Sequence, residues 1–237
     1  MNKSKLPFWI AIVIVIIFPI SFGYYFWQKG HKPILPESVL PIYGKKKPVE
    51  RVNAKGEKVV DTIFQTIPNF TFTDHLNRPF TQKDMRNTVW VVNFFFSTCP
   101  TICKDMTRNL RNVQNHFIED EEVRILSHTV DPETDSVGQL FRYAQENQIN
   151  SDKWLLVTGD KASIYNIARQ SYMVTATVGD GGPNDFIHSE KLILVDREGR
   201  LRGYYDGTDS LDVQRMITDA EKLLVAYVVP RKPAEDE

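Results

Sequence analysis

The sequence predicts an α/β domain in which helices cover both faces of a mixed β-sheet. The first observation is the run Val89–Ser97, which is nearly all apolar and rich in β-branched and aromatic residues, as in a strand buried on both faces. The second is the stretch after it, Ile102–Phe117, which carries apolar side chains at helical spacing. The third is the alternation of strand-like and helix-like segments down to the C-terminus, which is typical of a sheet between helical layers.

The remaining elements follow from the same patterns. A hairpin is predicted where apolar and polar residues alternate through Asn69–Thr73 and the chain turns into Pro79–Thr81. The later strands are expected at Val123–Val130, Trp154–Thr158, Lys191–Asp196 and Arg200–Tyr205. The later helices are expected at Val137–Ala144, after a cap at Asp160, and from a cap at Asp209 or Ser210 to just before Pro230.

An uncharged stretch, Leu6–Trp27, precedes this domain. About 20 apolar residues are needed to cross a bilayer, so the stretch is long enough to span one. Trp9 near one end and Tyr24 and Trp27 at the other match the aromatic belts of two membrane interfaces. A cleaved signal peptide has a shorter apolar region and ends at small residues. We therefore expect one uncleaved N-terminal transmembrane helix.

The chain accordingly divides into a cytoplasmic N-terminus (1–5), a transmembrane anchor (6–27), a Pro-rich and charged tether (28–60) and a folded domain (61–237). Lysines flank both ends of the apolar stretch, so charge bias alone decides little about orientation. We place the domain outside, because a short basic start usually stays in the cytoplasm. The N-terminus is not Arg-rich, which favours a bacterial inner membrane and a domain facing the periplasm over a mitochondrial location.

The charge balance and the cysteine content exclude two classes of protein, nucleic-acid-binding proteins and disulfide-stapled scaffolds. The 29 Lys and Arg residues nearly balance the 30 Asp and Glu residues, so no basic footprint for nucleic acid is present. The run Lys45–Lys47 is expected to be a solvated cluster, with a lipid headgroup contact as the alternative. A disulfide-stapled scaffold would need more than the two cysteines present. Two neighbouring cysteines instead indicate chemistry at one point.

The two cysteines, Cys99 and Cys103, follow a buried strand and begin a helix. Sites in such sheets form just beyond the carboxyl ends of the strands. A helix N-terminus favours anions and is expected to lower the pKa of a thiol there. The four-residue spacing brings both sulfurs to one side of the first turn, where they can close a disulfide or chelate a soft metal. A purely structural disulfide is the weaker interpretation, because so short a loop removes little unfolded-state entropy.

A metal would need a third ligand, and His188 is the candidate. It follows the Gly-rich stretch Gly179–Pro183 and immediately precedes a predicted strand, so it can reach the cysteines. The other histidines lie in the tether, the hairpin turn, the end of a helix and the interior of a strand: His31, His75, His116 and His128. Two thiolates and one imidazole suit copper, as Cu(I) or Cu(II), whereas structural zinc usually takes four protein ligands. Asp131, directly after the second buried strand, could orient His188 or contact a partner.

Several motifs appear together between Asp61 and the C-terminus: FFFSTCPTIC, SHTVDPETD, DFIHSE and LRGYYDGT, behind the N-terminal anchor. In this combination the chain resembles the Sco (SenC) family of copper chaperones for cytochrome c oxidase. The resemblance implies a thioredoxin-like fold with copper held by Cys99, Cys103 and His188. It further implies that copper is delivered to the dinuclear copper site of oxidase subunit II, or that cysteines of that site are reduced.

One position departs from the family pattern. Asp131 matches the Asp-Pro position of the family near the site. Many members carry Asp directly before the histidine, whereas this chain has Ile187 there and Asp185 further upstream. The departure affects the predicted register of the loop before His188 and its contacts with a partner. It does not affect the assignment of His188 as the candidate ligand.

Two functions of different class remain open. A metallochaperone would need both cysteines and His188. A thiol–disulfide oxidoreductase would need the cysteines alone, together with a thiol reductant that restores them. A peroxidase is a special case of this interpretation and also needs no metal. The usual oxidoreductase motif has two residues between its cysteines, and this chain has three. A redox sensor that docks partners through its oxidised loop is a third interpretation.

Overall fold

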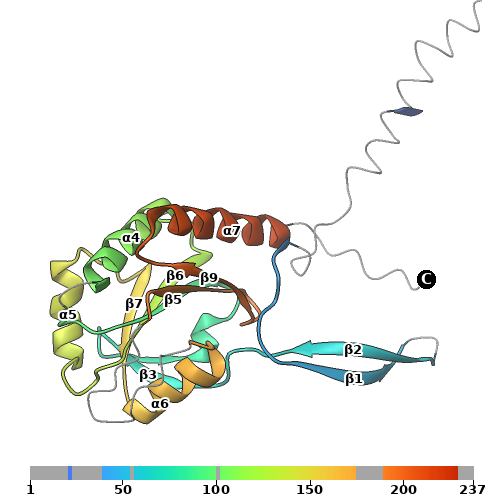
Figure 1. Cartoon of the computed structure of the whole chain (residues 1–237), viewed down its shortest axis with the longest axis horizontal. Helices are drawn as coiled ribbons and strands as arrows, with labels where there is room; N and C mark the ends of the chain where they lie inside the picture. Colours follow the sequence, from blue (N-terminus) through green and yellow to red (C-terminus); the bar gives the residue numbers. More distant parts are fainter. Residues whose placement is uncertain (1–20, 23–38, 54–55, 100–101, 175–188, 229–237) are drawn as a thin grey trace, which may run out of the picture.

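The structure is a computed structural model that describes residues 21–22, 39–53, 56–99, 102–174 and 189–228, with the backbone alone at 102 and 103. Its centre is a seven-stranded mixed sheet in the order β4-β3-β7-β6-β5-β8-β9 (Figure 1). These strands span Thr71–Asp74 (β3), Pro79–Thr81 (β4), Val89–Phe95 (β5), Val123–Thr129 (β6), Trp154–Thr158 (β7), Lys191–Val195 (β8) and Leu201–Asp206 (β9). The sheet and its strand positions agree with the sequence prediction.

Strand β5 lies inside the sheet, between β6 and β8, and is buried at every position. It pairs in parallel with β6 and antiparallel with β8. Its side chains alternate between two separate apolar cores, with Val91 and Phe95 in one and Trp90 and Phe94 in the other. Burial on both faces explains why its sequence is nearly continuous in apolar residues rather than alternating with polar ones.

Helices cover both faces of the sheet, as predicted (Figure 1). One face is covered by α4 (Ile102–His116), α5 (Val137–Glu146) and α7 (Ser210–Val228). The other face is covered by α6 (Lys161–Asn166), which continues as a π-helical turn, η3 (Ile167–Ser171), and by the short 3₁₀ helix η2 (Gln82–Met85). The predicted cap at Asp160 is confirmed, because its carboxylate accepts a hydrogen bond from the Ser163 amide at 2.8 Å.

The segment predicted as a tether contains regular structure that its composition does not indicate. Strands β1 (Lys46–Val52) and β2 (Lys58–Phe64) form a separate two-stranded antiparallel sheet. This hairpin extends away from the main sheet (Figure 1). We call residues 45–53 and 56–64 the ribbon. The division of the chain at residue 60 stays a prediction, and β2 crosses that position.

The predicted transmembrane anchor, residues 6–27, lies outside the described residues except for Ser21 and Phe22. Within the part of the chain that the structure describes, no helix combines the length and the apolar character that crossing a membrane requires.

A buried ion pair fixes the point at which the N-terminal segment joins the domain. The side chains of Asp196 and Arg202 are both fully buried and lie 2.9 Å apart, and Arg200 also donates to Asp196 at 2.8 Å. The Arg202 guanidinium also donates to the carbonyl oxygens of Leu40 and Pro41, at 2.6 and 3.2 Å. The chain before the ribbon is thereby attached to β9.

His128 is a buried histidine on β6 whose two ring nitrogens have no hydrogen-bond partner among the described residues. It is surrounded by aromatic rings, with Phe94 stacked at 5.1 Å and Phe72 edge-on at 5.4 Å between centroids. Burial lowers the pKa of His128 from 6.5 to about 3, because the charged ring would lose its hydration. The folded protein therefore keeps His128 neutral.

We predict that this histidine makes the domain sensitive to acid. Once the chain unfolds, His128 regains a pKa near 6.5, so the unfolded state binds the additional proton below that pH. The contribution to stability is fully present above pH 6.5 and is lost as the pH falls toward about 3; near pH 4.5 the loss is roughly 3 kcal/mol. In urea unfolding near pH 7.5 and pH 4.5, His128→Phe should lose less stability than wild type. The exposed control His116→Phe should behave as wild type, and equal acid losses in all three proteins would disprove the prediction.

Candidate metal centre

The cysteine loop leaves the carboxyl end of β5. Strand β5 ends at Phe95, Cys99 follows four residues later, and α4 begins at Ile102. Cys99 is only 6% exposed and belongs to the core beneath α4 and α7. Its amide donates to the Phe96 carbonyl oxygen at 3.3 Å, which closes a tight turn after the strand. The predicted position of Cys99, between a buried strand and a helix N-terminus, is confirmed.

The other two predicted ligands fall partly or wholly outside the described residues. Cys103 lies in the first turn of α4, and its side chain is outside the description. His188 is also outside it, but the next residue, Ser189, is described and buried. Among the side chains that the structure describes, no three His, Cys, Asp or Glu groups gather within reach of one metal ion.

The position of Ser189 can be compared with that of the cysteine loop through the sheet. Strand β8 runs antiparallel to β5, with Ile193 opposite Val92. The start of β8 therefore lies at the edge where β5 ends, and extending this register by two residues sets Lys191 opposite Phe94. Ser189, two residues earlier, reaches the same edge of the sheet as the loop that carries Cys99.

Asp131 lies at this edge as well. It follows β6, the parallel neighbour of β5, in a register that sets Thr129 opposite Phe95. Asp131 is 8% exposed; its amide donates to the Thr129 hydroxyl at 3.0 Å, and its carbonyl accepts from the Asp135 amide at 2.8 Å. The structure thus confirms that Asp131 is level with the cysteine loop. Its role toward His188 stays a prediction.

The residue that sequence reasoning missed is Asp135. Its side chain is fully buried and accepts hydrogen bonds from the Ser97 amide at 3.0 Å, from the Thr129 hydroxyl at 2.5 Å and from the Ser97 hydroxyl. Ser97 also accepts from the Gln139 side chain at 3.2 Å. Because Ser97 stands two residues before Cys99, Asp135 ties the cysteine loop to the end of β6. Only the SHTVDPETD run, which contains Asp135, offered a signal in the sequence.

Comparison with known proteins agrees with this arrangement. The SCO1/SenC family profile matches residues 61–225. The SCO1 protein homolog of Bacillus subtilis is 27% identical over 168 residues, which cover 70% of this chain and 86% of that protein. The match begins inside β2, so β1 precedes the region shared with the family.

Solved structures show the same fold. A SCO1/SenC family lipoprotein from Bacillus anthracis superposes with a TM-score of 0.61 at 27% identity, over 68% of this chain and 95% of its own. BsSco, a member of the Sco family of cytochrome c oxidase assembly proteins with a disulfide switch, gives 0.58 at 27% identity, over 67% and 93%. ScoI of Bradyrhizobium japonicum, solved with copper bound, gives 0.54 at 20% identity, over 67% and 99%, and at that identity shows the fold alone.

The thioredoxin-like sheet expected from the motifs is therefore confirmed. The family profile covers well over half of the chain, including β3 to β9 and the cysteine loop. This chain belongs to the SCO1/SenC family.

Proposed function

We propose that this protein is a membrane-anchored copper metallochaperone that binds one copper ion through Cys99, Cys103 and His188. It helps to assemble the dinuclear copper site of cytochrome c oxidase subunit II. One observation supports the ligand set above all others: the loop of Cys99 and the chain that continues from His188 at Ser189 meet at the same edge of the sheet. Segments about 90 residues apart in sequence are thus brought together at the usual site of this kind of fold.

The donor atoms fit copper chemically. Thiolates bind Cu(I) strongly, and an imidazole nitrogen is accepted by both Cu(I) and Cu(II), so one site can hold copper in either state. Cys99 is nearly buried, which limits the access of water to that sulfur. Asp131 at the same edge is available to orient the imidazole through its second nitrogen. Copper is the cargo here, and the protein supplies a site that can load and release it.

The relatives support both the cargo and the recipient. A Sco protein of the same fold has been solved with copper bound, and BsSco belongs to a family of cytochrome c oxidase assembly proteins. We extend copper binding and oxidase assembly from these proteins to this chain. The relative from Bacillus anthracis is a lipoprotein. We propose that this chain is attached instead by a single transmembrane helix, residues 6–27, in a bacterial inner membrane, with the domain facing the periplasm.

A second function is favoured by the disulfide switch of BsSco. Cys99 and Cys103 could reduce a disulfide of an extracytoplasmic partner, with or without later copper transfer. In that reaction the partner's disulfide becomes two thiols, while the two thiols of this protein become one disulfide. A thiol reductant must then restore them, and His188 is not required.

The test is an anaerobic copper titration of the reduced full-length protein. We expect one Cu(I) per chain for wild type, and loss of tight binding in Cys99→Ser, Cys103→Ser and His188→Ala, because each variant removes one of three ligands. The matched control is His116→Ala, which removes an exposed imidazole on α4 that pairs with Glu221 at 2.9 Å. It should bind copper as wild type does.

A disulfide-reduction assay on the same variants separates the two functions. If His188→Ala keeps full copper binding, His188 is not a ligand and the proposed ligand set fails. If wild type binds no copper tightly while the cysteine variants lose reductase activity, the protein is a dithiol oxidoreductase and the metallochaperone proposal fails. If His188→Ala loses copper and retains disulfide reduction, both activities share the cysteines.

A further inference from the structure

The ribbon presents aliphatic side chains to solvent. Val60 and Val52 are 71% and 67% exposed, and Ile63 and Val59 are 48% and 41% exposed. The ribbon belongs to no larger sheet, and an isolated two-stranded hairpin is marginally stable in water at best. The strand register puts Val52 and Val60, the two most exposed, on the same face of the ribbon, and Val59 and Ile63 on the other face. Two strongly exposed valines side by side on one face indicate a surface that something else covers.

The base of the ribbon is cationic. Two ion pairs neutralise its outer part, Arg51 with Asp61 at 3.4 Å and Lys58 with Glu50 at 3.9 Å. Among the described residues, by contrast, no carboxylate lies within ion-pair distance of the run Lys45–Lys47. The Lys46 ammonium instead lies 5.4 Å from the centre of the Phe64 ring. Three consecutive cations are thus left available to an external anion.

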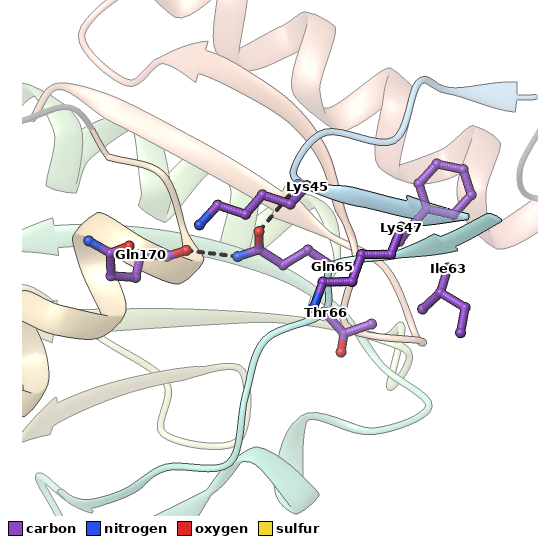
Figure 2. Close-up of a pocket in the computed structure, with 7 residues that line it drawn as sticks. Lys45, Lys47, Ile63, Gln65, Thr66 and Gln170 are labelled. Carbon is purple, nitrogen blue, oxygen red and sulfur yellow. Dashed lines mark hydrogen bonds between the residues drawn. The ribbon is translucent and has the colours of Figure 1, made fainter. Parts of the chain in front are cut away.

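A groove of about 410 Å³ lies between the ribbon base and η3. It is lined by Lys45, Lys47, Ile63, Phe64, Gln65, Thr66 and Gln170. Figure 2 shows Lys45 and Lys47 on either side of Gln65. The Gln65 amide nitrogen donates to the Gln170 carbonyl at 2.7 Å, and its oxygen accepts from the Lys45 backbone amide at 3.3 Å. The groove therefore combines two ammonium groups with an apolar wall.

The ribbon leaves the domain on the side opposite to the candidate metal centre. Just after β2, the Ile67 amide donates to the Gly199 carbonyl at 2.8 Å. Gly199 lies in the turn that follows β8, and β8 runs antiparallel to β5. This turn is therefore at the amino end of β5, whereas Cys99 follows its carboxyl end. A surface that holds the ribbon leaves the metal centre accessible from the other side.

We propose that the ribbon docks on the anionic surface of the lipid bilayer. Its lysines would contact lipid phosphates, and Val52 and Val60, which share one face of the ribbon with Lys46, would contact the acyl boundary, as amphipathic surfaces do at membranes. This proposal rests on the membrane anchor proposed above. Seventeen residues (28–44) separate Trp27 from Lys45 and reach about 60 Å at full extension, so the ribbon cannot lie further than that from the end of the anchor. Docking would point the metal centre away from the membrane, toward a partner.

The experiment is hydrogen–deuterium exchange of the full-length protein in nanodiscs. One set contains phosphatidylcholine alone, and the other contains phosphatidylcholine with phosphatidylglycerol. We expect amides of β1 and β2 to exchange at least about tenfold more slowly in the anionic nanodiscs, since each lysine near an anionic surface contributes to binding. The triple variant Lys45→Gln, Lys46→Gln, Lys47→Gln should lose this difference. A control with Lys83→Gln, Lys161→Gln and Lys222→Gln, three lysines on the main domain, should keep it.

Equal exchange of the ribbon in both lipid compositions would overturn the proposal. Slower exchange that appears only when solubilised oxidase is added without anionic lipid would also overturn it, and would assign the ribbon to a protein partner. Copper stoichiometry measured in the same samples keeps this test separate from the proposed function. A failure of lipid docking leaves copper binding intact, whereas a failure of the metallochaperone proposal leaves the lipid dependence of ribbon exchange intact.

Discussion

Replacing Asp135 with alanine is expected to lower the free energy of unfolding by about 3 kcal/mol and to weaken copper binding about tenfold or more. The Asp135 carboxylate is fully buried and accepts hydrogen bonds from Ser97 and Thr129. Without it, these donors lose their acceptor in a site that water does not reach freely, and hydrogen bonds to charged groups are the costly ones to lose. The cysteine loop then loses the contact that holds it to β6.

Asp74 provides a matched control for this effect. It is equally buried and accepts from the Leu76 and Arg78 amides and from the Arg78 guanidinium, all at 2.8–2.9 Å. It ends β3, which is separated from β5 by β7 and β6, and these hydrogen bonds stay within its own turn, so Asp74 does not hold the cysteine loop. Asp74→Ala should lose comparable stability in urea unfolding and keep copper affinity. If Asp135→Ala also keeps copper affinity, Asp135 supports the fold alone and does not position the site.

Oxidation of Cys99 and Cys103 to a disulfide is expected to abolish copper binding, with a loss of affinity of several orders of magnitude. The thiolate is the form that binds metal, and a disulfide sulfur is a poor ligand. The oxidised site would keep a single imidazole, which cannot hold copper tightly alone. The disulfide switch of BsSco, a relative of the same fold, is consistent with such control.

The measurement is anaerobic equilibrium dialysis against Cu(I) buffered by a competing chelator, since Cu(II) in air could itself oxidise the thiols. Reduced protein should retain one copper per chain, and oxidised protein should retain none. Treatment with a thiol reductant should restore binding, which separates oxidation from damage. Stoichiometric copper in protein whose disulfide is verified by mass spectrometry would refute the prediction.

Much of the domain could be predicted because its elements carry the signals that burial imposes. Strand β5 is buried on two faces, and its sequence is apolar at every position except Asn93. Helix α4 contacts one core and shows an apolar stripe through Met106, Leu110 and Val113. Because β5 and β6 run in parallel, the residues that follow them lie at the same edge of the sheet. This reasoning placed Asp131 level with the cysteine loop.

Features without a buried face, or dependent on tertiary contacts, could not be predicted in this way. The ribbon has solvent on both sides, so its valines follow no pattern that burial would impose, and its lysines and Pro48 gave it the composition of a tether. Asp135 is recognisable only once β5 and β6 bring Ser97 and Thr129 together. The π-helical turn after Asn166 likewise has no signature in the apolar spacing that predicted a helix there.

Copper X-ray absorption spectroscopy of the reduced, Cu(I)-loaded full-length protein tests the ligand set most directly. The account predicts two sulfur neighbours and one imidazole nitrogen, with the imidazole scattering lost in His188→Ala and retained in His116→Ala. A spectrum of His188→Ala that is unchanged from wild type would contradict the convergence of this histidine with Cys99 and Cys103.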